Sequence, residues 1–333
     1  MQYARLGSSD LEVSRICLGT VFRGGRDETE CLAAIEAALD LGCTFLDCAN
    51  VYRQGFSESV VGRAVQGRRQ RVVVSTKVGA RADGVRTGGL RRSAILEACE
   101  ESLRRLRTEY LDCYLCHFPD EETPLAETLE ALDLLVRQGK ARYAGCSNFE
   151  GWRLAETLGL CHERGWSAPM VDQVGYSLLD RRPEDEVIPY CRRRGLAVTA
   201  YAPTAIGLLS GRYRFGEPPP PGSSWYRGPY NFRAAMTPGV GRVLEAVGEV
   251  AGRHGRTPVQ VALAWCLRSP VVVAAILGCD SAAQVRENLA AADWVLPPEE
   301  VAYLDEVSEG QRLIVRKDCP HGYLGSPDPT PEP

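Results

Sequence analysis

Apolar, β-branched runs alternate along this chain with segments whose apolar residues recur at helical spacing. Strands are expected at residues 15–19, 44–48, 71–76, 110–116, 141–147, 170–175, 196–202 and 271–277. Helices are expected at residues 28–42, 90–106, 123–140, 148–165, 184–195, 241–255, 257–269 and 281–292. Strands that alternate with helices predict a parallel sheet, and nearly continuous apolar strands indicate burial on both faces. Glycines directly after the expected helices are typical stop signals.

Eight such units predict an α/β fold of the (β/α)8 TIM-barrel type, for which 333 residues is an ordinary length. Residues 3–13 form two short strands around a Gly7–Asp10 turn, and we expect this β-hairpin to plug the bottom of the barrel. An open doubly wound sheet is the alternative. However, no G-x-G-x-x-G follows an expected strand, and "GVGRVL" from Gly239 is better interpreted as a helix start.

Extra helices and loops are expected near the C-terminus. We expect residues 1–310 to form one barrel domain and residues 311–333 to form a tail, partly flexible because "GSPDPTPEP" lacks apolar periodicity. The segment 212–239, rich in proline, glycine and aromatics, follows the seventh strand. A loop of this length is usually functional or disordered, and its aromatic residues favour a lid over a ligand.

Composition and charge narrow the class of protein. A net charge of −4 argues against a nucleic-acid-binding surface. No window approaches the ~18 apolar residues of a membrane span, and the N-terminus has no basic segment followed by an apolar run. The 13 cysteines are scattered and lie mostly in apolar segments. This usage predicts reduced thiols, no membrane association and a cytoplasmic location.

Cys113, Cys116 and His117 form a C-x-x-C-H pattern, which in other proteins attaches haem or begins a metal site. The remaining histidines, His162, His254 and His321, stand alone, and no second ligand pair completes a zinc site. In a strand, residues three apart point to opposite faces. The segment is therefore predicted to be a barrel strand, with neither metal nor haem.

Polar residues end three successive strands. Asp47 ends the second strand, with Tyr52 just beyond it; Lys77 ends the third and His117 the fourth. Side-chain parity directs them to one mouth, and chemistry in TIM barrels occurs at the C-terminal strand ends. Each residue also has a structural interpretation: a buried Asp47–Lys77 ion pair, a loop anchor at Tyr52, and a core histidine. Their coincidence at one mouth favours a catalytic site.

The chemistry of this set is that of a tuned proton donor. Free tyrosine has a pKa near 10 and is a poor acid at neutral pH. An adjacent ammonium lowers this pKa, and Asp47 can hold Lys77 in the required place. His117 can hydrogen-bond and orient a carbonyl oxygen. Such a site still requires an electron source.

Several long motifs, in order, resemble the aldo-keto reductase superfamily over about residues 1–310. "FLDCANVYRQGFSESVVG" is similar to its first signature, and "LRRLRTEYLDCYLCHFPD" to the second, ending near His117. "GCSNF", "VDQVGYSLLDR" and "YAPTAIGLLSGRY" resemble the later cofactor segments. The resemblance implies an NAD(P)-dependent aldo-keto reductase or alcohol (sugar) dehydrogenase. Hydride would pass reversibly between an extended nicotinamide cofactor and an aldehyde, ketone or sugar carbonyl, with Asp47, Tyr52, Lys77 and His117 catalytic and Tyr52 the general acid/base.

By the same resemblance, cofactor and substrate residues can be assigned. The cofactor-binding set is Gly19, Thr20, Val21, Asp47, Ser147, Asn148, Gln173, Tyr201, Gly207, Leu208, Ser210, Arg212, Gly278, Asp280, Gln284, Glu287 and Asn288. The substrate-binding set is Phe22, Tyr52, His117, Phe118 and Trp225. Ser147, Asn148 and Gln173 would bind the carboxamide, and Tyr201 would stack on the nicotinamide ring. The loop at residues 207–212 would hold the pyrophosphate.

Cofactor preference depends on Asp280. Many relatives place a basic residue early in this segment to pair with the 2′-phosphate of NADP(H). A carboxylate repels that phosphate but can accept a hydrogen bond from a free ribose 2′-OH, so NAD(H) is the expected cofactor of the two. The alternative is that Asp280 only caps the next helix, for which Ser281 is also suited.

Two other functions stay open. Some relatives resemble potassium-channel β subunits, so a redox-sensing regulatory subunit is the rival to a metabolic enzyme. A lyase or isomerase on the same barrel would usually need a metal or phosphate site that the sequence lacks. The expected partner is a small carbonyl or alcohol, with a sugar among the candidates, and no oligomeric state is predicted.

Overall fold

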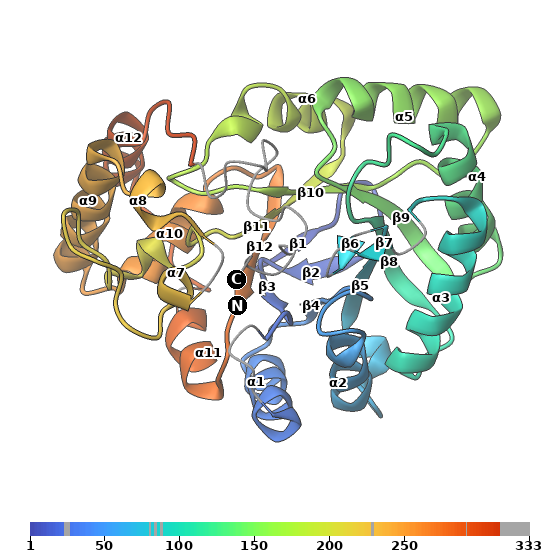
Figure 1. The fold of residues 1–333 in the computed structure, drawn as a ribbon, viewed down its shortest axis with the longest axis horizontal. Helices are drawn as coiled ribbons and strands as arrows, with labels where there is room; N and C mark the ends of the chain where they lie inside the picture. Colours follow the sequence, from blue (N-terminus) through green and yellow to red (C-terminus); the bar gives the residue numbers. More distant parts are fainter. Residues whose placement is uncertain are drawn as a thin grey trace, which may run out of the picture.

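The computed structural model describes residues 1–22, 27–79, 81–82, 85–86, 89–227, 230–290 and 292–313 (Figure 1). Of the tail predicted at residues 311–333, residues 311–313 are described and the rest lies outside the described residues, as do residues 23–26 of the loop after the first barrel strand. Among the described residues, no helix is both long enough and apolar enough to cross a membrane.

Eight parallel strands close into a barrel in the order β10-β11-β12-β3-β4-β5-β8-β9. The strands are β3 (Ile16–Gly19), β4 (Phe45–Asp47), β5 (Val73–Val78), β8 (Leu111–Cys116), β9 (Ala141–Ser147), β10 (Val171–Gly175), β11 (Ala197–Tyr201) and β12 (Val272–Gly278). Closure confirms the predicted (β/α)8 fold and rules out the open sheet. All six residues of β5 and of β8 are buried, as expected for strands covered on both faces.

A two-stranded antiparallel sheet, β1 (Tyr3–Arg5) with β2 (Glu12–Ser14), precedes the barrel. Its turn packs against the chain just before β10 and at the start of β11. A Cβ on Gly7 would lie 2.8 Å from the Met170 carbonyl oxygen, and the positive φ of 58° also favours glycine there. The hairpin thus covers the N-terminal end of the barrel, as predicted.

Helices surround the barrel (Figure 1). They are α1 (Glu28–Asp40), α2 (Phe56–Ala64), α3 (Arg92–Leu106), α4 (Leu125–Arg137), α5 (Gly151–Arg164), α6 (Val187–Arg194), α7 (Ser224–Arg227), α8 (Phe232–Ala235), α9 (Pro238–His254), α10 (Pro258–Cys266), α11 (Ala282–Leu289) and α12 (Pro298–Val307). Short 3-10 helices are η1 (Arg69–Arg71), η2 (Arg182–Glu184) and η3 (Leu208–Ser210). A further hairpin joins β6 (Arg81–Ala82) to β7 (Val85–Arg86).

Capping residues explain several helix boundaries. Thr257 and Gln260 form a capping box at the start of α10, with Pro258 in the first turn. Thr237 likewise caps α9, so the "GVGRVL" segment lies inside a helix, as predicted. Gly165 and Gly195 end α5 and α6 in the left-handed conformation, which costs glycine little.

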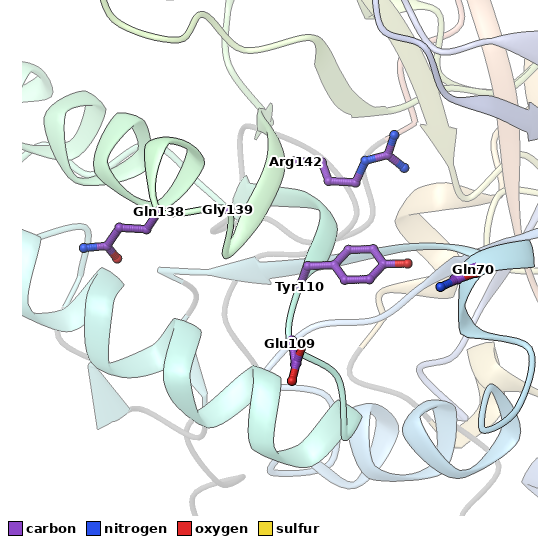
Figure 2. A pocket seen from close by; sticks show the side chains of 6 residues that line it. All are labelled: Gln70, Glu109, Tyr110, Gln138, Gly139 and Arg142. Atoms are coloured by element: carbon purple, nitrogen blue, oxygen red, sulfur yellow. The ribbon is translucent and has the colours of Figure 1, made fainter.

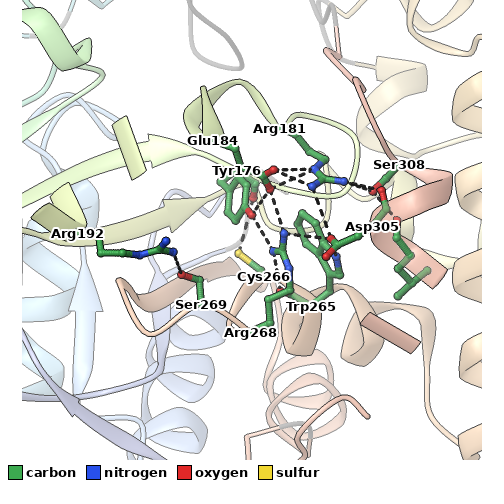
Figure 3. Close-up of polar contacts among 11 residues, drawn as sticks. Tyr176, Arg181, Glu184, Arg192, Trp265, Cys266, Arg268, Ser269, Asp305 and Ser308 are labelled. Carbon is green, nitrogen blue, oxygen red and sulfur yellow. Dashed lines mark hydrogen bonds and ion pairs between the residues drawn. The ribbon is translucent and has the colours of Figure 1, made fainter. Parts of the chain in front are cut away.

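A half-buried polar network ties the C-terminal helices to the barrel (Figure 3). The Arg268 guanidinium, just after α10, lies 3.7 Å from the Trp265 ring centroid and donates to the Tyr176 hydroxyl at 2.7 Å. It also pairs with Glu184 in η2 and Asp305 in α12, at 3.0 and 3.1 Å. Tyr176 directly follows β10, so this network anchors one strand end at the barrel mouth.

Candidate active site

Asp47, Lys77, Tyr52 and His117 meet at the C-terminal mouth of the barrel. Lys77 Nζ donates to Asp47 Oδ2 at 2.6 Å and to the Tyr52 hydroxyl at 3.3 Å. The rings of Tyr52 and His117 lie edge to face, with centroids 5.6 Å apart. Adjacent strands β4, β5 and β8 supply the carboxylate, the ammonium and, one residue beyond β8, the imidazole. The structure therefore brings the four predicted residues together.

The Asp47 carboxylate is fully enclosed by donors. Its Oδ2 accepts from Lys77, and its Oδ1 accepts from Ser75 Oγ at 2.6 Å and Gln173 Nε2 at 2.9 Å. Lys77 Nζ has a further acceptor, the Cys48 carbonyl, at 2.8 Å. Buried charges require such pairing, because an unpaired one loses its hydration without compensation.

Charge and burial set the protonation states of the site. Burial lowers the pKa of Lys77, but the Asp47 carboxylate, together with Tyr52 and Cys48, outweighs it and leaves the pKa well above the usual value. For His117, burial comes first and the Lys77 charge adds to it, so its pKa falls well below the ordinary range. At neutral pH the site thus holds an ammonium and a neutral imidazole.

The residues predicted to bind the nicotinamide carboxamide form one hydrogen-bonded chain. The Asn148 amide donates to the His117 carbonyl at 2.9 Å and to Ser147 Oγ at 3.0 Å, and accepts from the Tyr201 hydroxyl at 2.7 Å. Ser147 in turn donates to the Gln173 carbonyl at 2.9 Å. With the Gln173–Asp47 contact, this chain links β8, β9, β10 and β11 to the catalytic candidates.

The expected pyrophosphate and adenosine segments lie on the same mouth. Gly207 precedes η3 with φ of 87°, and the buried Ser210 Oγ has no hydrogen-bond partner among the described residues. Gly19 and Gly278 pair at the ends of β3 and β12, and a Cβ on Gly278 would meet open space. A buried hydroxyl without a partner after β11 and glycines at the ends of β3 and β12 suit an extended phosphate-bearing ligand at this mouth.

The structure shows which residue caps helix α11, for which the sequence offered both Asp280 and Ser281. Ser281 Oγ accepts from the Gln284 backbone N–H at 3.3 Å, while the Gln284 side chain accepts from the Asp280 N–H at 2.9 Å. Ser281, not Asp280, is therefore the N-cap. Farther along, Gln260 bonds the Glu287 carbonyl at 2.8 Å, and Asn288 lies 3.6 Å from the Cys279 sulfur.

The remaining cofactor candidates differ in surroundings. Thr20 is buried. Its Oγ1 donates to the backbone carbonyl of Asp47 at 2.9 Å and is hydrogen-bonded to Ser57 Oγ at 2.7 Å. Val21 follows it with a half-buried side chain, Leu208 is buried, and Arg212 is exposed. Their roles toward a cofactor stay predictions.

Backbone strain concentrates at this mouth. Among the described residues, eight non-glycine residues have positive φ, and all but Arg107 follow barrel strands at their C-terminal ends. The seven that follow barrel strands are Phe22, Arg53, Gln54, Asn148, Ala202, Ala205 and Ile206. Such conformations cost free energy for residues with a Cβ and cluster where function requires them.

The predicted substrate residues fall into two groups. Phe118 stacks on His117 with centroids 5.0 Å apart, beside Tyr52. Phe22 and Trp225 are each only 2% exposed. Trp225 donates to the Ile206 carbonyl at 3.2 Å and packs against Tyr230, so it supports the loop after β11. Contact of these residues with substrate stays a prediction.

Ser75 is a site residue that the sequence interpretation did not single out. Its parity with Lys77, two residues along the same strand, was the available signal. Its contact with Asp47 depends on the rotamers of both side chains, which alternation does not specify.

A separate hollow of about 630 Å³ lies at the other end of the barrel (Figure 2). Its lining, which includes Tyr110, Gly139 and Arg142, comes from residues before or at the start of β5, β8 and β9. It is therefore remote from the catalytic candidates. Arg142 is already paired there with Asp10 and Asp112.

Comparison with known proteins agrees with this geometry. The sequence model described as "Aldo/keto reductase family" matches residues 15–309. The oxidoreductase YrpG of Bacillus subtilis is 35% identical, over 93% of this chain and 97% of its own length. A probable voltage-gated potassium channel subunit beta of Arabidopsis thaliana is 32% identical, over 93% and 96%.

Among solved structures, the holo form of the aldo-keto reductase AKR11C1 from Bacillus halodurans aligns with a TM-score of 0.76. It shares 32% sequence identity, and the alignment covers 96% of this chain and 99% of that one. Family match, fold and near-complete coverage lead to one conclusion: this chain belongs to the aldo/keto reductase family of NAD(P)-dependent oxidoreductases.

Proposed function

We propose that the protein reversibly reduces a small aldehyde, ketone or sugar carbonyl, with Tyr52 as the general acid/base. The observation that carries this proposal is the position of Lys77, between the Asp47 carboxylate at 2.6 Å and the Tyr52 hydroxyl at 3.3 Å. Tyr52 donates a proton to the carbonyl oxygen in reduction and removes it from the alcohol in oxidation.

The ammonium makes Tyr52 a usable acid and base near neutral pH. A positive charge beside a phenol favours the phenolate, because the two opposite charges attract. Lys77 retains its charge because Asp47 stabilises it in a buried setting. A proton donor of matched pKa typically accelerates such a reaction by ~10²–10⁴-fold.

His117 is proposed to orient the substrate oxygen. Its imidazole is neutral and lies edge to face with Tyr52. A neutral ring retains one N–H donor, which can hydrogen-bond the carbonyl oxygen without competing as a stronger acid. Phe118, stacked on its face, restricts the ring's orientation.

The nicotinamide is proposed to lie against Tyr201, with its carboxamide near Ser147, Asn148 and Gln173. When bound, the cofactor supplies or accepts the hydride at the carbonyl carbon. The protein's own contribution is to place that carbon beside Tyr52 and His117. The Gln173 amide, whose N–H group is held by Asp47, keeps the cofactor site in register with the catalytic residues.

We further propose that NAD(H) is preferred over NADP(H). Because Ser281 caps α11, the half-buried Asp280 carboxylate is not used as the cap. A carboxylate at the adenosine end can accept a hydrogen bond from a ribose 2′-OH and would repel a 2′-phosphate.

A redox-sensing channel subunit remains the second candidate, supported by the likeness to the Arabidopsis protein named above. A panel of sugars, polyols and simple carbonyls, assayed in both directions with NAD(H) and NADP(H), tests the main proposal. Steady turnover of at least one small carbonyl is expected. No turnover, together with co-purification with a membrane channel, would favour the sensor.

A further inference from the structure

Ser75 lies directly beneath the catalytic candidates. It lies on the same inward face of β5 as Val73 and Lys77, which are two residues away on either side. It also pairs in register with Asp47 on β4. Its hydroxyl donates to Asp47 Oδ1 at 2.6 Å, and the residue is only 1% exposed. Among the described residues its hydroxyl is hydrogen-bonded to Asp47 and not to Lys77 Nζ, so we assign its effect on Lys77 and Tyr52 to Asp47.

We infer that Ser75 is a positioning residue for proton transfer: its hydroxyl holds the Asp47 carboxylate so that the Lys77 charge is directed at Tyr52. This inference rests on the proposed role of Tyr52. It adds a fifth residue to the four expected at the mouth.

The negative charge of Asp47 is shared between its two carboxylate oxygens. Oδ1 is shielded by two donors, Ser75 and Gln173, while Oδ2 faces Lys77. Without the Ser75 hydroxyl, less of the Asp47 charge is neutralised at Oδ1. More of that negative charge then acts on the Lys77 ammonium and on the Tyr52 phenol. Phenolate formation at Tyr52 is then less favourable, and its pKa rises.

Few other groups can produce such a change. The titratable groups near Asp47 and Lys77 on the adjoining strands are His117 and the thiols of Cys17, Cys48 and Cys113. Burial raises the pKa of each thiol well above neutrality and lowers that of His117, so all four are uncharged near pH 7. Among these groups of the described barrel wall, Asp47 and Lys77 thus carry the charges near Tyr52.

The next residue offers a matched control. Thr76 is fully buried, and its hydroxyl also donates to a buried carboxylate at 2.6 Å, that of Glu58. It faces α2 and not the mouth. Removing either hydroxyl deletes one buried hydrogen bond from the same strand, but only the Ser75 change alters the environment of Asp47.

The experiment measures the pKa of Tyr52 by the ultraviolet absorbance of tyrosinate. The titration of a Tyr52→Phe derivative is subtracted from that of its parent, which isolates Tyr52 without requiring turnover. We compare three parents: unaltered protein, Ser75→Ala and Thr76→Val. The expected result is a Tyr52 pKa raised by about 0.5–1 unit in Ser75→Ala, unchanged in Thr76→Val, and restored in Ser75→Thr.

With an activated aromatic aldehyde and its alcohol as the probe pair, the pH dependence of kcat should move by the same amount while KM for NAD(H) stays within about two-fold. An unchanged or lowered Tyr52 pKa in Ser75→Ala would overturn the inference. If Ser75→Ala does not fold, Ser75→Cys, of similar size but a weaker donor, gives the same comparison. Full activity in Tyr52→Phe would instead contradict the proposed function.

Discussion

The Lys77 ammonium and the Asp47 carboxylate form an ion pair at 2.6 Å in which both side chains are at most 3% exposed. A buried pair of this kind is costly to break, because the residue left behind keeps a charge without a partner. Asp47 therefore has two effects: it keeps Lys77 charged, and it prevents loss of stability from an isolated buried ammonium.

Asp47→Asn should destabilise the protein by about 3 kcal/mol, since it leaves Lys77 unpaired. Combining it with Lys77→Met should recover most of the loss but none of the activity, because the second change removes the orphaned charge. Urea denaturation of both variants measures this. A double variant less stable than the single one would contradict the account.

The strands show how far alternation of apolar residues can predict a fold. The expected strand over residues 141–147 coincides with β9, and every barrel strand lies within two residues of its expected bounds. Glycine stops likewise marked helix ends, as at Gly165 and Gly195. These features follow from local backbone preferences, which the sequence carries directly.

What was not predicted depends on tertiary contacts. Helix α2 follows Gly55 and contains Ser57 and Gly62, which weaken its apolar pattern. A Cβ on Gly62 would lie 2.7 Å from the α3 backbone, so packing and not propensity selects glycine there. In the site, parity placed Asp47, Lys77 and His117 at one mouth, whereas the Gln173 contact to Asp47 requires a closed barrel to bring β10 opposite β4.

Asp172 predicts a pH dependence of stability. It lies on β10 beside Cys146 of β9, fully buried, and neither oxygen has a hydrogen-bond partner of ordinary geometry among the described residues. Burial raises its pKa to about 8. The folded state therefore binds a proton that the unfolded state releases near pH 4, and stability falls as the pH rises from about 4 to about 8.

Asp172→Asn should remove this dependence. Relative to the unaltered protein, the free energy of unfolding of the variant should rise with pH, by about 5 kcal/mol between pH 4 and pH 9. Asp112, buried and paired with Arg69 at 2.7 Å, supplies the control. Asp112→Asn should lower stability at both ends of the range, because it weakens that ion pair. A pH-independent difference between Asp172→Asn and its parent would show that Asp172 is ionised throughout.

Asp280→Arg should shift cofactor preference toward NADP(H) by about 10-fold or more, the scale of one charge-assisted contact. Asp280→Asn, which removes the charge without adding one, should shift it less. The ratio of kcat/KM for the two cofactors measures both. An unaltered enzyme that strongly prefers NADP(H) would mean that Asp280 does not contact the 2′-position.

The most direct test of the central claim is turnover by Tyr52→Phe. The ring and its packing against His117 are retained, while the proton donor is lost. We predict a fall in kcat of ~10²-fold or more, with NAD(H) affinity nearly unchanged when binding is titrated by nicotinamide fluorescence. Activity within a few-fold of the unaltered enzyme would contradict the role assigned to Tyr52.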